Sequence, residues 1–148
     1  MVPKRFIMIV KGYILKLGGK NFMKKIAIIA SGENIDAAYK VLNIANAAAT
    51  MDVNVVVFCT FGGLQLLFKE PQYPMIPLLE PFKDNLKTIP TVTELRESAV
   101  ELGVTFIACQ MTMDLMGITS DSLIDGITTA GAASFLEEAL DADSTITF

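Results

Sequence analysis

Two short apolar runs separated by one helical segment constrain the fold of this chain more than any other feature. Residues 26–30 and 55–60 are rich in β-branched side chains and free of charge, as in strands covered on both faces of a sheet. Between them, apolar residues recur at helical spacing through residues 35–51. A strand, a helix and a second strand in this order predict a β-α-β unit, in which the two strands are parallel and the crossover is right-handed.

The rest of the chain repeats this alternation of strands and helices. A capping box formed by Thr91 and Glu94 predicts a helix over residues 93–102, and Gly103 ends it. Three further segments complete the pattern: a buried strand at 104–107, a helix at 130–140 and an edge strand at 144–148. At 148 residues the chain is long enough for one domain with its own core. We therefore expect a single-domain α/β fold with a mostly parallel sheet of about five strands.

The most informative candidate residue is Cys109, which follows the buried strand at 104–107 directly. Gln110 to Met116 are compatible with a helix that ends at Gly117, so the cysteine is expected where a strand meets a helix start. In open α/β sheets this edge is the usual place for ligand sites. Unpaired helix N–H groups and the helix dipole would also favour a thiolate there. The alternative is that Cys109 is a small apolar filler, as most buried free cysteines are.

Composition excludes several kinds of chemistry. The chain has no histidine, which rules out Ser-His and Cys-His catalysis and histidine metal sites. Its two cysteines are fifty residues apart and form neither a zinc pattern nor a disulfide framework. We therefore expect no metal, no cofactor and a reduced, cytoplasmic setting. Cys59 lies inside a strand and is interpreted as a core filler.

The balance of charge and hydropathy points to protein contacts rather than nucleic acid. Apolar residues make up 52% of the chain and charged residues 19%, so part of the apolar surface is expected to meet other subunits in a homo-oligomer. Residues 1–22 carry five basic and no acidic side chains, which leaves residues 23–148 with a net charge of −9. That acidity argues against a nucleic-acid-binding domain.

Residues 1–22 are predicted to be a basic extension, non-native or disordered, that precedes the α/β domain at 23–148. Their apolar runs are too short to span a bilayer, so we expect no transmembrane segment. The alternative is an amphipathic piece that contacts a surface or another subunit.

Two other strand ends supply candidate binding residues. Ser31 and Gly32 follow the first strand and could hold an anion through backbone N–H groups, although an ordinary strand-to-helix turn would look the same. Phe61 and Gly62 follow the second strand, where the glycine pair 62–63 permits close approach of a ligand or of another part of the backbone.

The segment from 69 to 90 contains five of the six prolines and several large apolar residues. Proline discourages regular elements, and a connection of this length is usually a lid, a binding loop or an interface arm. We expect it to fold over the body or over a neighbouring subunit.

The sequence Cys-Gln-Met-Thr-Met-Asp-Leu-Met-Gly at 109–117 resembles that of the DsrE/DsrF-like proteins, especially the subgroup often labelled "peroxiredoxin family protein". Ser31-Gly32, residues 61–64 and residues 126–133 add to the resemblance, which covers about residues 23–148. It implies a flavodoxin-like three-layer fold, trimers or hexamers, and a cytoplasmic role in sulfur relay. Such proteins carry sulfane sulfur as a persulfide or as bound thiosulfate and exchange it with TusA-like carriers and rhodaneses. Their sulfur-carrying cysteine matches Cys109.

The leading hypothesis is accordingly a sulfur carrier or sulfurtransferase component that acts through Cys109. Backbone N–H groups of Gln110 and Met111 would stabilise the thiolate, and the Gln110 side chain could add a hydrogen bond. Met111, Met113 and Met116 are expected to pack as flexible apolar fill, and Asp114 to face solvent or cap a neighbour. A non-catalytic oligomeric module that binds a small anion or nucleotide is the alternative. A thiol peroxidase would need a Pro-x-x-x-Thr-x-x-Cys motif, which the sequence lacks.

Overall fold

The computed structural model describes residues 7–10, 13–16 and 24–148. The strands are β1 (Ile7–Val10), β2 (Tyr13–Lys16), β3 (Lys25–Ala30), β4 (Asn54–Cys59), β5 (Thr105–Cys109), β6 (Thr128–Ala130) and β7 (Ser144–Thr147). The α-helices are α1 (Ile35–Thr50), α2 (Val92–Glu101), α3 (Gln110–Met116) and α4 (Ala132–Leu140). Three 3₁₀ helices complete the chain: η1 (Phe61–Leu67), η2 (Glu80–Thr88) and η3 (Ser120–Ser122).

Five strands form one parallel sheet in the order β6-β5-β4-β3-β7. The β3-α1-β4 unit is the crossover predicted from the sequence, and its two strands pair from Lys25 with Asn54 to Ala30 with Cys59. The last strand, β7, returns to the other side of β3 and forms an edge, as expected. The predicted α/β fold with a mostly parallel sheet of about five strands is confirmed.

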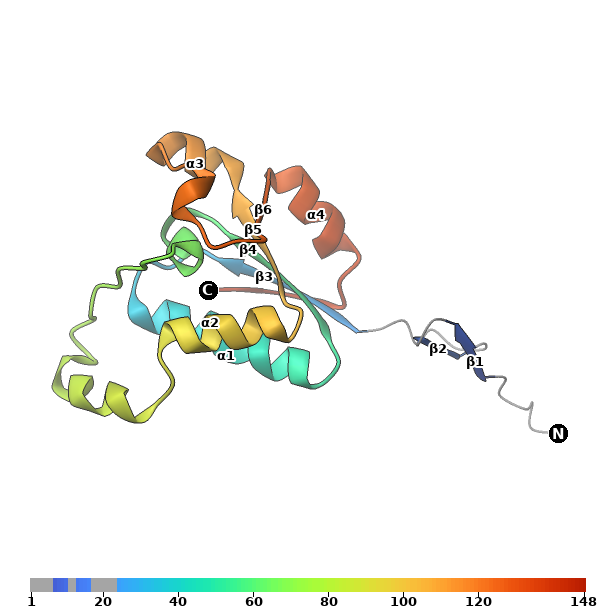
Figure 1. Cartoon of the computed structure of the whole chain (residues 1–148), viewed down its shortest axis with the longest axis horizontal. Helices are drawn as coiled ribbons and strands as arrows, with labels where there is room; N and C mark the ends of the chain where they lie inside the picture. The colour runs from blue at the N-terminus through green and yellow to red at the C-terminus, as the bar shows by residue number, and fades with distance from the viewer. Residues whose placement is uncertain (1–6, 11–12, 17–23) are drawn as a thin grey trace.

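Helices cover both faces of the sheet and make three layers (Figure 1). Helices α1 and α2 pack together on one face, where the larger core cluster lies; its fully buried side chains include Ile28, Leu42, Val57 and Leu64. Helix α4 covers the other face, and its Phe135 stacks on Phe58 of β4 with ring centroids 4.8 Å apart. Strands β4 and β5 are buried on both faces except at their first residues, in agreement with their continuous apolar sequence.

Glycines allow the chain to pass close to itself at the carboxyl edge of the sheet. A Cβ atom at Gly63 would lie 1.9 Å from the carbonyl oxygen of Ala30, and one at Gly62 would lie 2.5 Å from Cβ of Glu33. The glycine pair therefore lets the chain after β4 pack closely against the end of β3 and the turn that follows it. Gly32 allows a similar close contact with α1, since a Cβ atom at Gly32 would lie 2.4 Å from that of Ala37.

The predicted ends of several elements are confirmed or shifted by one or a few residues. Thr91 and Glu94 form the predicted capping box, and α2 begins at Val92, one residue before the prediction. Residues 1–22 lie partly outside the described residues. Within them β1 pairs antiparallel with β2, and the proposal that this segment is a non-native or disordered extension stays a prediction.

The segment 69–90 differs from the expectation that it folds over the body. Its helix η2 has no buried residue, and Leu78 and Phe82 are 74% and 55% exposed. Figure 1 shows this part, in yellow-green, reaching out beside α1 and α2. The difference is confined to η2, because the part of the segment before it is held to the body: the N–H of Lys69 donates to the carbonyl of Ser122, the N–H of Ile35 donates to the carbonyl of Pro74, and Tyr73 packs against the core. A contact with a neighbouring subunit stays a prediction.

Among the helices of residues 24–148, none is long and apolar enough to cross a membrane.

Candidate functional site

Cys109 is the last residue of β5, and α3 begins at the next residue. It pairs with Ala130 of β6, and the residue before it pairs with Cys59 of β4. Since the strands are parallel, their carboxyl ends meet at one edge of the sheet, and Cys109 lies at that edge as predicted. Its side chain is 4% exposed and packs in the cluster on the α4 face.

The two cysteines lie on opposite faces of the sheet. Cys59 belongs to the cluster under α1 and α2, whereas Cys109 belongs to the cluster under α4. Complete burial raises the pKa of the Cys59 thiol far above its ordinary value, so it stays protonated. The interpretation of Cys59 as a core filler is supported by these observations, and Cys109 is the thiol placed at the sheet edge.

Two threonine hydroxyls line the surroundings of the Cys109 sulfur. Thr60 follows β4, Thr112 lies in the first turn of α3, and their Oγ1 atoms are 3.1 Å apart. The backbone N–H of Phe61 also donates to Oγ1 of Thr112, at 3.1 Å. Thr112 is fully buried. Its hydroxyl therefore ties the residues after β4 to the helix that begins at the cysteine.

These donors hold the pKa of the Cys109 thiol below its ordinary value. Burial acts most strongly and raises the pKa, but it is outweighed by the hydroxyl and backbone N–H of Thr112, the hydroxyl of Thr60 and the backbone N–H of Met111. Cys109 is the N-cap residue of α3, but its side chain forms no capping hydrogen bond with the helix. The sulfur lies just below the surface, among groups that favour a thiolate.

The other residues predicted around the cysteine separate into two groups. Met113 is buried in the core below α1 and α2, as apolar fill. The expectation that Met111 also packs as apolar fill is wrong, because its side chain is 61% exposed. Its backbone N–H acts on the sulfur instead. The Gln110 amide donates to Asp114 at 2.7 Å, and both side chains are exposed. The Gln110 side chain therefore contacts its own helix rather than the sulfur. Asp114 faces solvent, as expected, and accepts the hydrogen bond from Gln110.

Ser31 and Gly32 lie at the same edge but have other roles in this chain. The backbone N–H and the hydroxyl of Ser31 both donate to the carbonyl of Phe148, each at 2.8 Å. Gly32 packs against Ala37, as described above. Because both Ser31 donors bind the oxygen of Phe148, an anion at this turn would need other donors, and the anion cradle stays a prediction.

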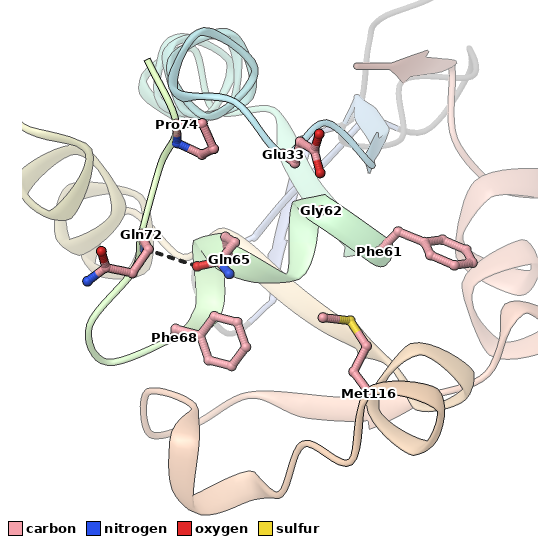
Figure 2. Close-up of a pocket in the computed structure, with 8 residues that line it drawn as sticks. All are labelled: Glu33, Phe61, Gly62, Gln65, Phe68, Gln72, Pro74 and Met116. Carbon is pink, nitrogen blue, oxygen red and sulfur yellow. Dashed lines mark hydrogen bonds between the residues drawn. The ribbon is translucent and has the colours of Figure 1, made fainter. Parts of the chain in front are cut away.

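Phe61 and Gly62 line a cavity of about 340 Å³ next to α3 (Figure 2). Glu33, Gln65, Phe68 and Met116 also border it. Phe61 has a left-handed backbone, with φ of 47°, and its side chain is 49% exposed. This conformation costs energy for a residue with a side chain. The hydrogen bond from its N–H to Thr112 helps to hold it.

Thr60 and Thr112 are the site residues that sequence reasoning missed. Each carries a signal: Thr60 is the first residue after a buried strand, and Thr112 lies three positions after the cysteine, in the first helical turn. Parallel strands bring such residues to one edge. Within residues 24–148, His, Cys, Asp and Glu do not form a group of three or more that could hold a metal ion.

The fold and the site define an α/β protein with a shallow, thiolate-favouring cysteine at the carboxyl edge of a parallel sheet. A family model described as DsrE/DsrF/DrsH-like matches residues 23–76 and 72–147. The chain belongs to the DsrE/DsrF/DrsH-like family.

Two relatives are similar over most of their length. The sulfur carrier protein DsrE2 of Allochromatium vinosum is 36% identical over 151 residues, covering 81% of this chain and 95% of the relative. The uncharacterized protein YrkE of Bacillus subtilis is 31% identical over 149 residues, covering 78% of this chain and 91% of the relative.

Solved structures share the fold at low sequence identity. A protein of unknown function from Methanobacterium thermoautotrophicum superposes with a TM-score of 0.58 at 16% identity, covering 84% of this chain and 99% of that one. The ychN protein of E. coli gives a TM-score of 0.57 at 19% identity, covering 85% and 100% of the two chains.

Proposed function

We propose that this protein is a sulfur carrier, or a component of a sulfurtransferase system, which holds sulfane sulfur on Cys109 in a sulfur relay. The observation that carries the proposal is the position of the Cys109 sulfur: it lies just below the surface at the carboxyl edge of the sheet, among hydroxyl and N–H groups that lower its pKa. The likeness to a sulfur carrier protein supports the same role.

The chemistry needs one thiolate and no external oxidant. The Cys109 thiolate attacks the outer sulfur of a donor persulfide, R–S–SH. A new S–S bond forms on Cys109, the S–S bond of the donor breaks, and R–S⁻ leaves with the electron pair. The hydrogen stays on the transferred sulfur, which gives Cys109–S–SH. Delivery to an acceptor thiolate is the same displacement in reverse. A thiosulfate group would come from tetrathionate: the Cys109 thiolate attacks a central sulfur, the central S–S bond breaks, thiosulfate leaves with the electron pair, and Cys109–S–S–SO₃⁻ remains.

The hydroxyl pair gives this cysteine a means of stabilising charge. The Thr112 oxygen accepts the hydrogen bond from the Phe61 N–H, and this bond uses neither the Thr60 nor the Thr112 hydroxyl hydrogen. One bridges the two oxygens, and the other is available to the sulfur. A thiolate accepts such a bond more strongly than a thiol, so the charged form is favoured both before attack and after release.

The relay would also need partners. TusA-like carriers and rhodanese-like proteins are the proposed donors and acceptors, and the proposed setting is the cytoplasm, where thiols stay reduced. We also propose a homo-oligomer, a trimer or a hexamer. Exposed apolar residues support it; they lie on η2, α3 and α4 and include Phe82, Leu115 and Leu140.

Intact-mass analysis after exposure to polysulfide or tetrathionate tests the proposal. The reduced protein is expected to gain sulfur or a thiosulfate group that a reductant removes, whereas Cys109→Ser gains nothing. Cys59→Ala is the matched control because Cys59 is fully buried on the other face of the sheet, and it should load like the parent protein. Unmodified parent protein, or equal loading of Cys109→Ser, would overturn the proposal.

A further inference from the structure

We propose that the cavity beside α3 receives a basic side chain of the protein that exchanges sulfur with Cys109, so that the partner surface around its reactive thiol is positively charged. This inference rests on the proposed function, and it names the partner's chemistry from the cavity. Its borders include Glu33, Phe61, Gln65, Phe68 and Met116.

The walls of the cavity suit a long side chain with a positive end. Phe61, Phe68 and Met116 border the cavity and supply apolar surface for a hydrocarbon stem, and an aromatic ring attracts a cation that lies over its face. At about 340 Å³ the cavity lies near the lower end of the roughly 300–1,000 Å³ typical of ligand sites. It has room for one side chain rather than for a large cofactor.

The polar groups of the cavity match a basic peptide. Glu33 is the charged residue among those that border it, and its carboxylate is exposed. The Gln65 amide oxygen accepts the backbone N–H of Gln72 at 3.0 Å, and Figure 2 shows its nitrogen turned the other way. That nitrogen is available to a backbone carbonyl of the partner, while Glu33 is available to the cation.

The net charge of the domain reinforces this preference. Residues 23–148 carry a net charge of −9. The nearest cation in sequence, Lys69, donates to the carbonyl of Asp121 and does not border the cavity. An acidic surface attracts a basic partner from a distance and speeds association, more strongly at low salt.

The cavity and the thiol are close enough for one partner segment to engage both. Met116 lies seven residues after Cys109, at the other end of α3, which corresponds to roughly 10 Å along the helix. An extended peptide covers that distance in about three residues. Thr112 also links the two places, because it lies beside the sulfur and accepts the N–H of Phe61, which borders the cavity.

Transfer to peptides tests the inference. The sulfur-loaded protein is mixed with synthetic peptides of equal length that carry one cysteine and, three residues away, either arginine or glutamate. The peptide thiolate attacks the outer sulfur of Cys109–S–SH, the S–S bond to Cys109 breaks, and the Cys109 thiolate leaves. Mass spectrometry follows the persulfide on each peptide. We expect the arginine peptide to react roughly tenfold faster at low salt, with a smaller advantage at high salt.

Two variants locate the effect. Glu33→Gln should remove most of the preference for arginine, leaving the part that the net charge of the domain contributes, measured at equal initial loading of Cys109. Asp84→Asn is the matched control, since this exposed acid lies on η2 outside the cavity, and the preference should persist.

The outcomes separate the two proposals. If the wild-type protein does not load sulfur, the proposed function fails. If it loads but transfers equally fast to both peptides, or if Asp84→Asn lowers the preference as much as Glu33→Gln, the cavity inference alone is overturned. Sedimentation analysis adds one further outcome. A change of oligomeric state in Glu33→Gln would mean that a second copy of this chain occupies the cavity, which also overturns the inference.

Discussion

The hydroxyl oxygens of Thr60 and Thr112 lie 3.1 Å apart and join the end of β4 to the first turn of α3, beside Cys109. Neither residue is next to the cysteine in sequence. Their contact exists because β4 and β5 are paired in parallel, with Cys59 opposite Ala108, which places both strand ends at one edge. The reactivity of the cysteine is therefore a property of two neighbouring strands and one short helix.

This contact predicts the pH dependence of Cys109 alkylation. In the parent protein the midpoint is expected below 9.0, the ordinary value for a thiol, because the surrounding donors lower the pKa. Thr112→Val removes the hydroxyl that donates to the sulfur and accepts the Phe61 N–H, so the midpoint should rise and the rate near neutral pH should fall. Thr112→Ser keeps the hydroxyl and should behave like the parent. Rates of iodoacetamide modification across pH measure this, and a midpoint that is the same in Thr112→Val and Thr112→Ser would contradict it.

The close passage of the chain at Gly63 predicts a large loss of stability in Gly63→Ala. The new Cβ would lie 1.9 Å from the backbone oxygen of Ala30, which no side-chain movement can relieve. We expect roughly 3 kcal/mol or more of lost unfolding free energy. Gly131→Ala is the control, because nothing lies within 4 Å of its Cβ position and its φ is −86°. Its cost should stay within about 1 kcal/mol, that of a weaker helix N-cap. Urea unfolding compares the two, and similar stabilities would show that the backbone can move apart.

Burial of Cys59 predicts a loss of stability at alkaline pH. The pKa of the Cys59 thiol is raised in the folded state. Its contribution to the free energy of unfolding is therefore complete below the pKa of the unfolded state and falls as the pH rises above that value. The lowered pKa of Cys109 acts in the opposite sense, and its contribution is lost as the pH falls through the folded-state value. In Cys59→Ala the loss between about pH 8 and pH 10 should shrink by up to roughly 2 kcal/mol.

Denaturant unfolding of the parent protein and of Cys59→Ala at both pH values checks this. The variant starts about 1–2 kcal/mol less stable because a small cavity remains. Tyr73 is present in both proteins, so the rise in its pKa caused by burial is shared, whereas the smaller rise caused by Cys59 is lost in the variant. Parallel pH profiles would show that the Cys59 thiol can ionise without unfolding.

Arg96 predicts how the segment after η1 is held. Its buried guanidinium donates to the carbonyls of Leu66 and Phe68, at 3.0 and 2.6 Å, where η1 ends. Arg96→Met keeps the apolar stem but leaves both carbonyls without this donor, which should cost about 2 kcal/mol or more. Hydrogen exchange should also become faster in residues 66–73. Glu101→Gln, an exposed position at the end of α2, is the control and should change neither quantity. Unchanged exchange in Arg96→Met would mean that other contacts hold the segment.

Much of the fold followed from local patterns. Uncharged β-branched runs indicated β3, β4 and β5, the spacing of alanine and valine indicated α1, and the reciprocal Thr91 and Glu94 pair indicated the start of α2. These features depend on residues within one turn or one strand of each other. The position of Cys109 at the carboxyl edge followed as well, because a parallel sheet has one such edge.

The environment of the cysteine could not be predicted in the same way. Nothing local to Ser31 shows that its donors are bound by the carbonyl of Phe148, 117 positions away. Nothing local to Phe61 indicates its left-handed backbone, since that conformation is held in part by Thr112. The expectation that residues 69–90 fold over the body or over a neighbouring subunit came from proline content, length and apolar content. Helix η2 leaves its apolar side chains exposed within this chain, and their contact with a neighbouring subunit stays a prediction.

By itself the sequence determined which segments become strands and helices and that one thiol ends a buried strand. The tertiary structure decided the strand order, the placement of the two cysteines on opposite faces of the sheet and the meeting of Thr60 with Thr112. The physical reason is the range of the interactions involved. Hydrophobic periodicity acts within a segment, whereas a pKa shift or a cavity depends on atoms that come together only when distant segments pack.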